Sequence, residues 1–273
     1  MVAKAVKDIV ALDPVWEVLQ REAREIIAAD PAMGAFAHGA VLNQNSLEEA
    51  VAARIALRLD RAEVPADTIR RAFRDMWTDE PDWSEIVRVD IATVFDRDPA
   101  CERVIEPILY FKGFHAIQTH RLANWAHRKG RRDFSLYLQS VSSEVFQTDI
   151  NPACPFGRGI FIDHATGIVI GETSRIGDNV SLLQGVTLGG TGKNGEDRHP
   201  KVDDGVLVGA NAVVLGNITI GHCSRVAAGS VVLKDVPANT TVAGVPAKVV
   251  GVAGCAEPSR TMNQILADQD ATR

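Results

Sequence analysis

The sequence predicts an α+β fold in which an all-helical domain is followed by a coil of short parallel strands with one extruded loop. Three observations predict this. Only 4 of the 22 glycines precede Asn151, whereas 13 of the 15 aromatic residues do. Apolar side chains recur at helical spacing before this point, and they recur at every sixth position after it. Two architectures therefore share the chain.

Helix start signals divide residues 1–148, the predicted helical domain. Asp13-Pro14 and Asp30-Pro31 each place a capping acid before a proline, which is favourable at the first helical position. Ser46 to Glu49 forms a capping box, and apolar side chains recur every fourth residue from 47 to 59. We expect further helices over residues 67–77, 83–95, 105–129 and 133–146.

A six-residue apolar repeat organises residues 149–250. Ten anchors keep the step, namely Ile170, Ile176, Leu182, Leu188, Val202, Val208, Val214, Ile220, Val226 and Val232. Three units form one triangular turn, so anchors that are three units apart stack in a narrow aliphatic column. Ile150, Phe156 and Ile162 are two residues out of phase, which predicts an irregular first turn. A β-sandwich, the alternative, has a period of two.

Two segments do not fit the repeat. Thirteen residues between Leu188 and Val202 are rich in glycine and charge, so we expect residues 190–201 to leave the coil as a loop. Long loops on rigid scaffolds tend to be functional. Residues 251–273 are polar and contain glycine and proline, which predicts a flexible tail.

Charge and composition argue against several classes of partner. The net charge is -6, and no basic cluster favours a nucleic acid. No uncharged apolar run approaches the length of a membrane span, and no signal peptide is recognisable, so we expect a cytoplasmic protein. The four cysteines are far apart and predict reduced thiols, with neither a disulfide framework nor a zinc site.

Six motifs carry a family resemblance. They are Asp96-Arg97-Asp98-Pro99-Ala100, Tyr110-Phe111-Lys112-Gly113-Phe114-His115, Ile162-Asp163-His164-Ala165-Thr166-Gly167, Gly171-Glu172-Thr173, Gly189-Gly190-Thr191-Gly192-Lys193 and Asp197-Arg198-His199-Pro200. In this order they resemble the serine O-acetyltransferase family, from about residue 96 to residue 251. The resemblance implies a left-handed parallel β-helix of hexapeptide repeats, and transfer of acetyl from acetyl-CoA to L-serine in cysteine biosynthesis.

The implied reaction needs a base, because the serine hydroxyl is a poor nucleophile near neutral pH. Histidine suits this role. By resemblance, His164 is the catalytic base and Asp149 is the carboxylate that orients its imidazole, as in a serine-protease triad. The two residues are fifteen positions apart, which is nearly one turn of the coil, so they could lie on neighbouring turns.

Both charged groups of serine need partners. By resemblance, Asp98 and Asp163 face the ammonium group, while Arg198 and His199 on the loop face the carboxylate. Because Asp98 comes from the helical domain and Arg198 from the loop, we expect a cleft closed by several pieces, some from a neighbouring subunit. L-Cysteine carries the same two charged groups, so we expect it to be a competitive inhibitor.

Acetyl-CoA, the co-substrate, needs backbone donors and space. Gly190 and Thr191 allow close approach of the backbone, and Ala210 and Ala228 are three repeat units apart on one edge of the coil. Lys248 could meet the nucleotide phosphates. The coil itself requires glycine and alanine at its turns, so both interpretations stay open for these positions. We expect no metal cofactor.

Three other functions are compatible with a hexapeptide coil. Another O-acetyltransferase, acting on a sugar or antibiotic hydroxyl, would use the same base without groups for an amino acid. A carbonic anhydrase would need two histidines five apart on adjacent turns of the coil, but the one such pair, His115 and His120, lies in an expected helix. A purely structural trimer would bind no thioester.

The family resemblance also bears on assembly. It implies a homotrimer and, through the helical domains, a dimer of trimers. Many members end in an isoleucine that inserts into cysteine synthase. This sequence ends in Arg273, whose charge would be costly to bury there. We therefore expect a weak complex with cysteine synthase or none.

Overall fold

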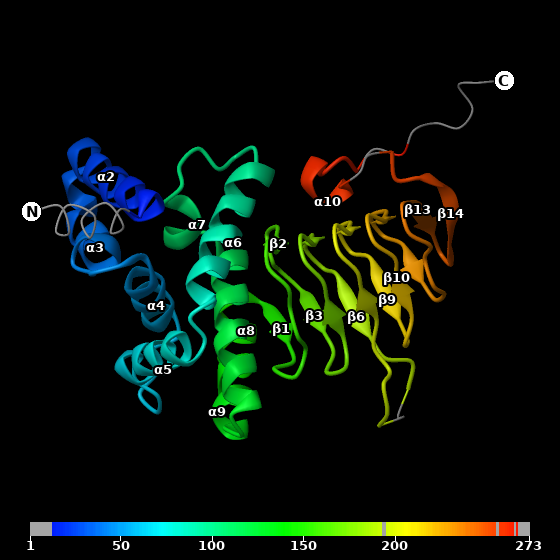
Figure 1. Cartoon of the computed structure of the whole chain (residues 1–273), viewed down its shortest axis with the longest axis horizontal. Helices are drawn as coiled ribbons and strands as arrows, with labels where there is room; N and C mark the ends of the chain where they lie inside the picture. The colour runs from blue at the N-terminus through cyan, green and yellow to red at the C-terminus, as the bar shows by residue number, and fades with distance from the viewer. Residues whose placement is uncertain (1–12, 193–194, 255–256, 265, 267–273) are drawn as a thin grey trace, which may run out of the picture.

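The computed structural model describes residues 13–192, 195–254, 257–264 and 266. Figure 1 shows the helices at one end of the molecule and a stack of short strands at the other, with α8 and α9 between them. The predicted division into a helical part and a repetitive strand part is confirmed. None of the helices in these ranges is long and apolar enough to cross a membrane.

The first helical elements of the chain include three that begin at the predicted capping residues Asp13, Asp30 and Ser46. The first elements are α2 (Pro14–Ala29), η1 (Pro31–Met33), α3 (Gly34–Ala37), η2 (His38–Leu42), α4 (Leu47–Arg58), α5 (Ala66–Asp79) and α6 (Trp83–Arg97). Asp13 caps α2 by accepting a hydrogen bond from the backbone N–H of Trp16, and Ser46 caps α4 by accepting one from Glu49. These local signals therefore work as expected.

The prediction of a single helix over 105–129 is wrong, because two helices occupy this range. α7 (Glu106–Leu109) ends after one turn and α8 (Lys112–Arg128) begins after Phe111, whose backbone is extended at φ -85° and ψ 108°. The Leu109 carbonyl, which would otherwise accept from the next helical turn, accepts from Nε and Nη2 of Arg54 at 3.1 and 2.8 Å. A long-range partner thus stabilises the break. α8 then packs along α9 (Arg132–Phe146).

Three sheets form the coil, and all described pairings within it are parallel except that between β13 and β14. Sheet A contains β1 (Thr148–Ile150), β3 (Ile168–Ile170), β6 (Thr187–Gly189), β9 (Val213–Leu215) and β12 (Val231–Val232). Sheet B contains β4 (Arg175–Ile176), β7 (Lys201–Val202) and β10 (Thr219–Ile220). Sheet C contains β2 (Phe161–Ile162), β5 (Ser181–Leu182), β8 (Leu207–Val208), β11 (Arg225–Val226), β13 (Thr240–Gly244) and β14 (Ala247–Val252).

Strand register gives the length of each turn of the coil. Val208 pairs with Val226, which is three repeat units later, and all ten predicted anchors are buried in one aliphatic core. Leu182 pairs with Val208, so this turn has eight more residues, which fall between β6 and β7. Ile162 pairs with Leu182, so the first turn has two extra residues. The predicted irregularity of the first turn is confirmed.

The outer faces of sheets A and B differ in chemistry. Sheet B presents polar side chains, Arg175, Lys201 and Thr219. The outward positions of sheet A are Asp149, Val169, Thr187, Val213 and Val231, of which three are valines, and Val169 is 43% exposed. Sheet A is therefore the flat apolar face that remains open to solvent in a single chain.

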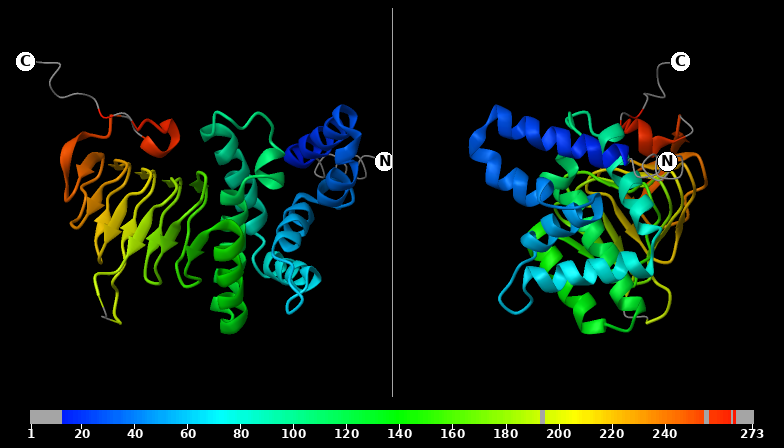
Figure 2. Two further views of the ribbon diagram at one scale, coloured as in Figure 1. Left: turned by 180° about the vertical axis from the view of Figure 1, so that it is seen from behind. Right: turned by 60° about the vertical axis from the view of Figure 1, so that its left-hand side comes forward.

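Sheet C is covered by the C-terminal segment. α10 (Pro258–Thr261) lies beside α6 and β8, as Figure 2 shows from behind. Ser181 Oγ donates to the carbonyl of Ser259 at 2.7 Å, and Arg225 Nη1 donates to that of Asn263 at 2.8 Å. These contacts lie within the tail expected from residue 251. The expectation of a weak complex with cysteine synthase, or none, rests on Arg273, which is outside the described residues.

Candidate active site

A cavity of about 440 Å³ lies where the helical domain meets the first turn of the coil. Asp98 reaches it from the end of α6, Lys112 from the start of α8, and Asp163 and His164 from the turn between β2 and β3. The rest of the lining is largely apolar, with Val94, Tyr110, Phe111, Phe114, Phe161 and Ile162. The structure thus brings together three of the predicted site residues.

The turn that carries His164 contains the two extra residues of the first coil turn. His164 and Ala165 are both left-handed, with φ of 55° and 60°, a conformation that is unfavourable for residues other than glycine. Ala165 is fully buried, whereas 74% of the His164 side chain is exposed. The longer turn therefore lifts the imidazole out of the coil and into the cavity.

Two carboxylates share this cavity with the imidazole. His164 Nε2 lies 3.6 Å from Asp163 Oδ1. Burial raises the pKa of Asp163 above its ordinary value, His164 acts in the opposite direction, and Asp98 adds to the rise. Two acidic groups so close to each other suit a cationic group of a ligand, which would relieve their repulsion.

Asp149, the expected partner of His164, lies on β1 in register with Val169. Its Oδ1 accepts a hydrogen bond from Nε2 of Gln139 at 2.7 Å, so α9 orients the carboxylate. Both residues of the expected pair belong to the described part of the chain, and no hydrogen bond joins them there. The role of Asp149 stays a prediction.

Arg198 and His199 lie at a different edge of the coil, between sheets A and B. Arg198 Nη2 donates to Glu172 Oε2 at 2.7 Å. His199 is almost buried, and its Nδ1 accepts from the backbone N–H of Thr173 at 3.2 Å. Burial, with help from Arg198, lowers the pKa of His199 and keeps its ring neutral. A single chain therefore does not bring these two residues into the His164 cavity.

The edge between sheets C and A, where His164 lies, continues along the coil. Three backbone hydrogen bonds of 2.8 Å join successive turns, from Gly185 to Thr166, from Asn211 to Gln184 and from Gly229 to Ala210. Strands stack about 4.8 Å apart, so the His164 turn and the turn of Ala228 are about 14 Å apart. Ala210 and Ala228 therefore lie on this edge. Lys248 is exposed on β14, and Gly190 and Thr191 are at the edge of Arg198.

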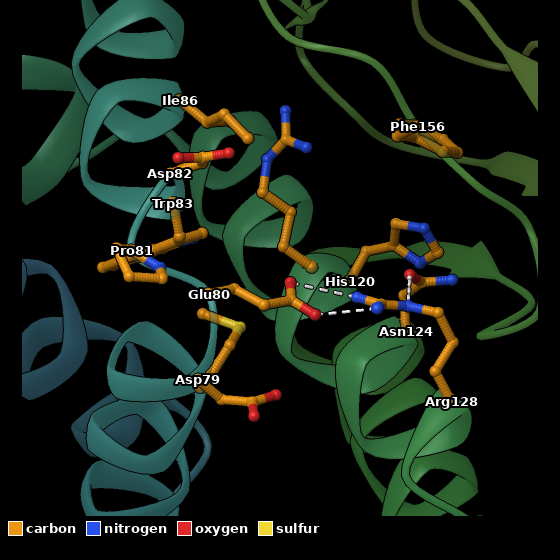
Figure 3. A pocket seen from close by; sticks show the side chains of 12 residues that line it. Asp79, Glu80, Pro81, Asp82, Trp83, Ile86, His120, Asn124, Arg128 and Phe156 are labelled. Atoms are coloured by element: carbon orange, nitrogen blue, oxygen red, sulfur yellow. Dashed lines mark hydrogen bonds and ion pairs between the residues drawn. The ribbon is translucent and has the colours of Figure 1, made fainter.

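A second cavity, of about 430 Å³, lies between the end of α5, the start of α6 and α8. Figure 3 shows Pro81, Trp83 and Ile86 on one side and His120 and Phe156 on the other. Its cationic groups already have partners: Arg128 pairs with Glu80 at 2.7 Å, and Arg121 pairs with Asp90 at 2.8 Å. We therefore place the chemistry in the first cavity, where an exposed imidazole faces two carboxylates.

The histidine pair of the carbonic anhydrase alternative is buried in α8. His115 Nε2 makes a hydrogen bond of 2.7 Å with the Ile108 carbonyl, and His120 Nε2 makes one of 2.9 Å with that of Cys154. Burial lowers the pKa of each to about 3. Both rings therefore have structural roles and face different carbonyls.

Sequence reasoning assigned no role to several residues that hold the site in place. Thr173 and Glu172 fix the loop residues, and Gln139 fixes Asp149. Lys112 contacts the His164 turn. Lys112, Glu172 and Thr173 belong to motifs that carry the family resemblance, and Lys112 is also a cation where a helix begins, a signal that required the correct helix boundary.

Two family models match parts of this chain. Residues 15–119 match the family described as "Serine acetyltransferase, N-terminal", and residues 199–234 match "Bacterial transferase hexapeptide (six repeats)". The serine acetyltransferase of Salmonella typhimurium is 46% identical over 253 residues, which is 93% of each chain.

Two solved structures are similar over nearly their whole length. The Brucella abortus serine acetyltransferase in complex with coenzyme A is 57% identical, covers 90% of this chain and 99% of that chain, and has a TM-score of 0.88. A serine acetyltransferase in complex with cysteine is 44% identical and has a TM-score of 0.90. The match covers 92% of this chain and 98% of that chain. On this evidence, the chain belongs to the serine acetyltransferase family of acyltransferases.

Proposed function

We propose that the transfer of acetyl from acetyl-CoA to the hydroxyl of L-serine takes place in the cavity of Asp98, Asp163 and His164. This proposal rests on one observation: two carboxylates and one exposed imidazole line the same cavity. The carboxylates hold the ammonium group of serine, which leaves its hydroxyl near the imidazole. A neutral sugar has no cation for this acidic pair.

His164 acts as the general base. Its imidazole takes the hydroxyl proton as the serine oxygen attacks the thioester carbonyl, and general-base assistance is worth about a hundred- to ten-thousandfold. The tetrahedral intermediate then collapses, the carbon–sulfur bond breaks, and the imidazolium returns the proton to the sulfur of CoA. O-Acetylserine and CoA are the products.

Asp149 orients the imidazole and stabilises its charged form. Gln139 donates to its Oδ1, which leaves acceptor capacity on the carboxylate, including Oδ2, for His164. Because the His164 side chain is mostly exposed, the ring can rotate towards sheet A, where Asp149 lies. The alternative partner is Asp163, which a pair of variants distinguishes (see Discussion).

Acetyl-CoA extends along the edge between sheets C and A. The small side chains of Ala210 and Ala228 leave the backbone accessible, and Lys248 is close to the end of the coil for the nucleotide phosphates. The coenzyme A complex of the Brucella abortus relative supports this ligand class. Gly190 and Thr191 approach the arm from a second chain.

Arg198 and His199 bind the serine carboxylate from a neighbouring subunit of a homotrimer. Two facts support this. Their edge and the His164 edge flank the same sheet, A, and the outer face of sheet A is apolar and open. Packing of one coil against the next buries that face. Two such trimers then associate through their helical domains.

Further features of the coil and of its setting follow from the family. The coil is left-handed, and residues 190–201 are pushed out of it, in agreement with the eight extra residues of that turn. L-Cysteine competes with serine because it carries the same charged groups, which agrees with the cysteine complex of a relative. The protein is cytoplasmic.

A thiol-release assay tests the proposed function. With acetyl-CoA, L-serine is expected to release CoA, whereas a panel of sugars and antibiotic alcohols is expected to release none above the blank. Release with a sugar but not with serine would support the other O-acetyltransferase. If none of the acceptors gave release of CoA, a purely structural protein would be supported.

A further inference from the structure

Lys112 occupies a position that its own helix disfavours. It is the first residue of α8, where the exposed N–H groups make the helix end positive, and a cation there is unfavourable. All of α8 lies in the described chain, its first turn has no acidic residue, and no described side chain caps it. A residue that breaks a local rule in a well-packed fold has a reason elsewhere in the structure.

The side chain of Lys112 reaches across to the turn that carries His164. Its Nζ donates to Thr166 Oγ1 at 2.5 Å and to Gln147 Oε1 at 3.2 Å. The hydroxyl of Thr166 in turn donates to the carbonyl of His164 at 3.3 Å. A continuous chain of hydrogen bonds therefore runs from the ammonium group of Lys112 to the backbone of His164.

Gln147 links Lys112 to the same turn through a second set of hydrogen bonds. Its carbonyl accepts from the backbone N–H of Gly167 at 2.9 Å, while its side chain accepts from Lys112. The turn needs such support because it has two consecutive left-handed residues that are not glycine, His164 and Ala165. Without external contacts, the turn would have a lower-energy backbone available.

Gly113 explains how Lys112 comes so close. A Cβ at this position would lie 2.0 Å from the carbonyl oxygen of Ile162, so only glycine lets the first turn of α8 rest on the end of β2. That contact places Lys112 directly beside residues 163–167. Lys112 and Gly113 therefore act together, one providing the hydrogen bonds and the other the close approach.

We propose that Lys112 is a positioning residue that holds the strained His164 turn, through Thr166 and Gln147, in the conformation that presents the imidazole to the cavity. This inference rests on the proposed role of His164 as the base. Lys112 lines the same cavity, but its ammonium group is bonded to Thr166 and Gln147 and so acts on the orientation of His164. Its loss therefore affects turnover more than the Michaelis constant for serine.

A double-mutant cycle of Lys112→Met and Thr166→Val tests the inference. Each single variant is expected to lower kcat about ten- to a hundredfold, since small misplacements of a catalytic group have effects of this size, with KM for serine within about a factor of two. The double variant is expected to be no slower than the slower single variant, because both changes break one chain of contacts. Lys112→Arg is expected to recover part of the loss.

Lys129→Met is the matched control, because Lys129 follows the end of the same helix and pairs with Asp79 away from the cavity. It should leave kcat unchanged, even if it lowers the melting temperature. An unchanged kcat for Lys112→Met, multiplicative losses in the double variant, or a rise confined to KM for serine would each overturn the proposal. His164→Ala is measured in parallel: if that variant stays active, the base assignment is wrong, whereas an inactive His164→Ala beside an active Lys112→Met overturns only the positioning role.

Discussion

Asp163 is half-buried beside Asp98, and its Oδ1 lies 3.6 Å from Nε2 of His164. In the proposed reaction, the partner of the serine ammonium group and the base that activates its hydroxyl are therefore neighbouring residues of one turn. Serine binding and proton transfer are therefore coupled, because any shift of the turn moves both the Asp163 carboxylate and the His164 imidazole. It also means that the Asp163 carboxylate competes with Asp149 as the partner of His164.

His164→Ala is expected to lower kcat for serine acetylation by at least about a hundredfold, the scale for removal of a general base. The dissociation constant for acetyl-CoA should change little, because the edge with Ala210 and Ala228 is untouched. Steady-state kinetics and isothermal titration with acetyl-CoA measure the two quantities. Near-normal turnover of the variant would rule out His164 as the base.

Asp149→Asn and Asp163→Asn are expected to separate the two carboxylates by their kinetic effects. Asp149→Asn should lower kcat less than His164→Ala does, because the imidazole remains and only its orientation and charge partner are weakened. Asp163→Asn should mainly raise KM for serine, because it removes a partner of the ammonium group. If Asp163→Asn lowered kcat and Asp149→Asn did not, the roles of the two residues would be exchanged.

The raised pKa of Asp163 predicts a pH dependence of serine binding. As the pH falls, Asp163 takes up a proton at a higher pH than an ordinary aspartate, the cavity loses negative charge, and KM for serine rises. Asp98→Asn removes one cause of the raised pKa, so the rise of KM should move to lower pH. KM for serine against pH is measured for both proteins. An equal or higher midpoint in Asp98→Asn would contradict the coupling of the two carboxylates.

Arg198→Ala is expected to raise KM for serine far more than KM for acetyl-CoA, because an unpaired substrate carboxylate loses about 2 kcal/mol or more. The same variant should weaken inhibition by L-cysteine in parallel. In the unaltered protein, this inhibition should be competitive with serine. If both Michaelis constants rose together, the loop would instead hold the thioester.

Two buried neutral histidines predict a loss of stability in acid. His115 and His120 have pKa values of about 3 in the folded protein and an ordinary value of 6.5, so the unfolded chain binds protons that the folded chain does not. The free energy of unfolding therefore falls as the pH decreases from 6.5 towards 3, by up to about 1.4 kcal/mol per pH unit for each histidine. Urea unfolding at pH 7 and at pH 5.5 measures this difference. His120→Gln keeps a donor for the Cys154 carbonyl and should reduce it.

The sequence alone determined the features that depend on neighbouring residues in the chain. Asp13 and Ser46 marked helix starts, and ten anchors on a six-residue step marked the coil, because capping and periodicity are local properties. The two-residue phase shift after Ile162 was also readable, although the sequence did not reveal that it lengthens the turn of His164. The family resemblance then supplied the candidate site residues.

Only the tertiary structure decided which of those residues share a cavity. Asp98 and His164 are far apart in sequence but meet because α6 ends beside the first turn of the coil, while Arg198 and His199 lie at another edge. Each insertion protrudes at the edge where it occurs, two residues between sheets C and A and eight between sheets A and B. The edge at which a site residue lies therefore depends on how the turns stack. The break before Lys112 likewise depends on a distant residue, Arg54, because the Leu109 carbonyl meets that guanidinium only when α4 packs beside α7.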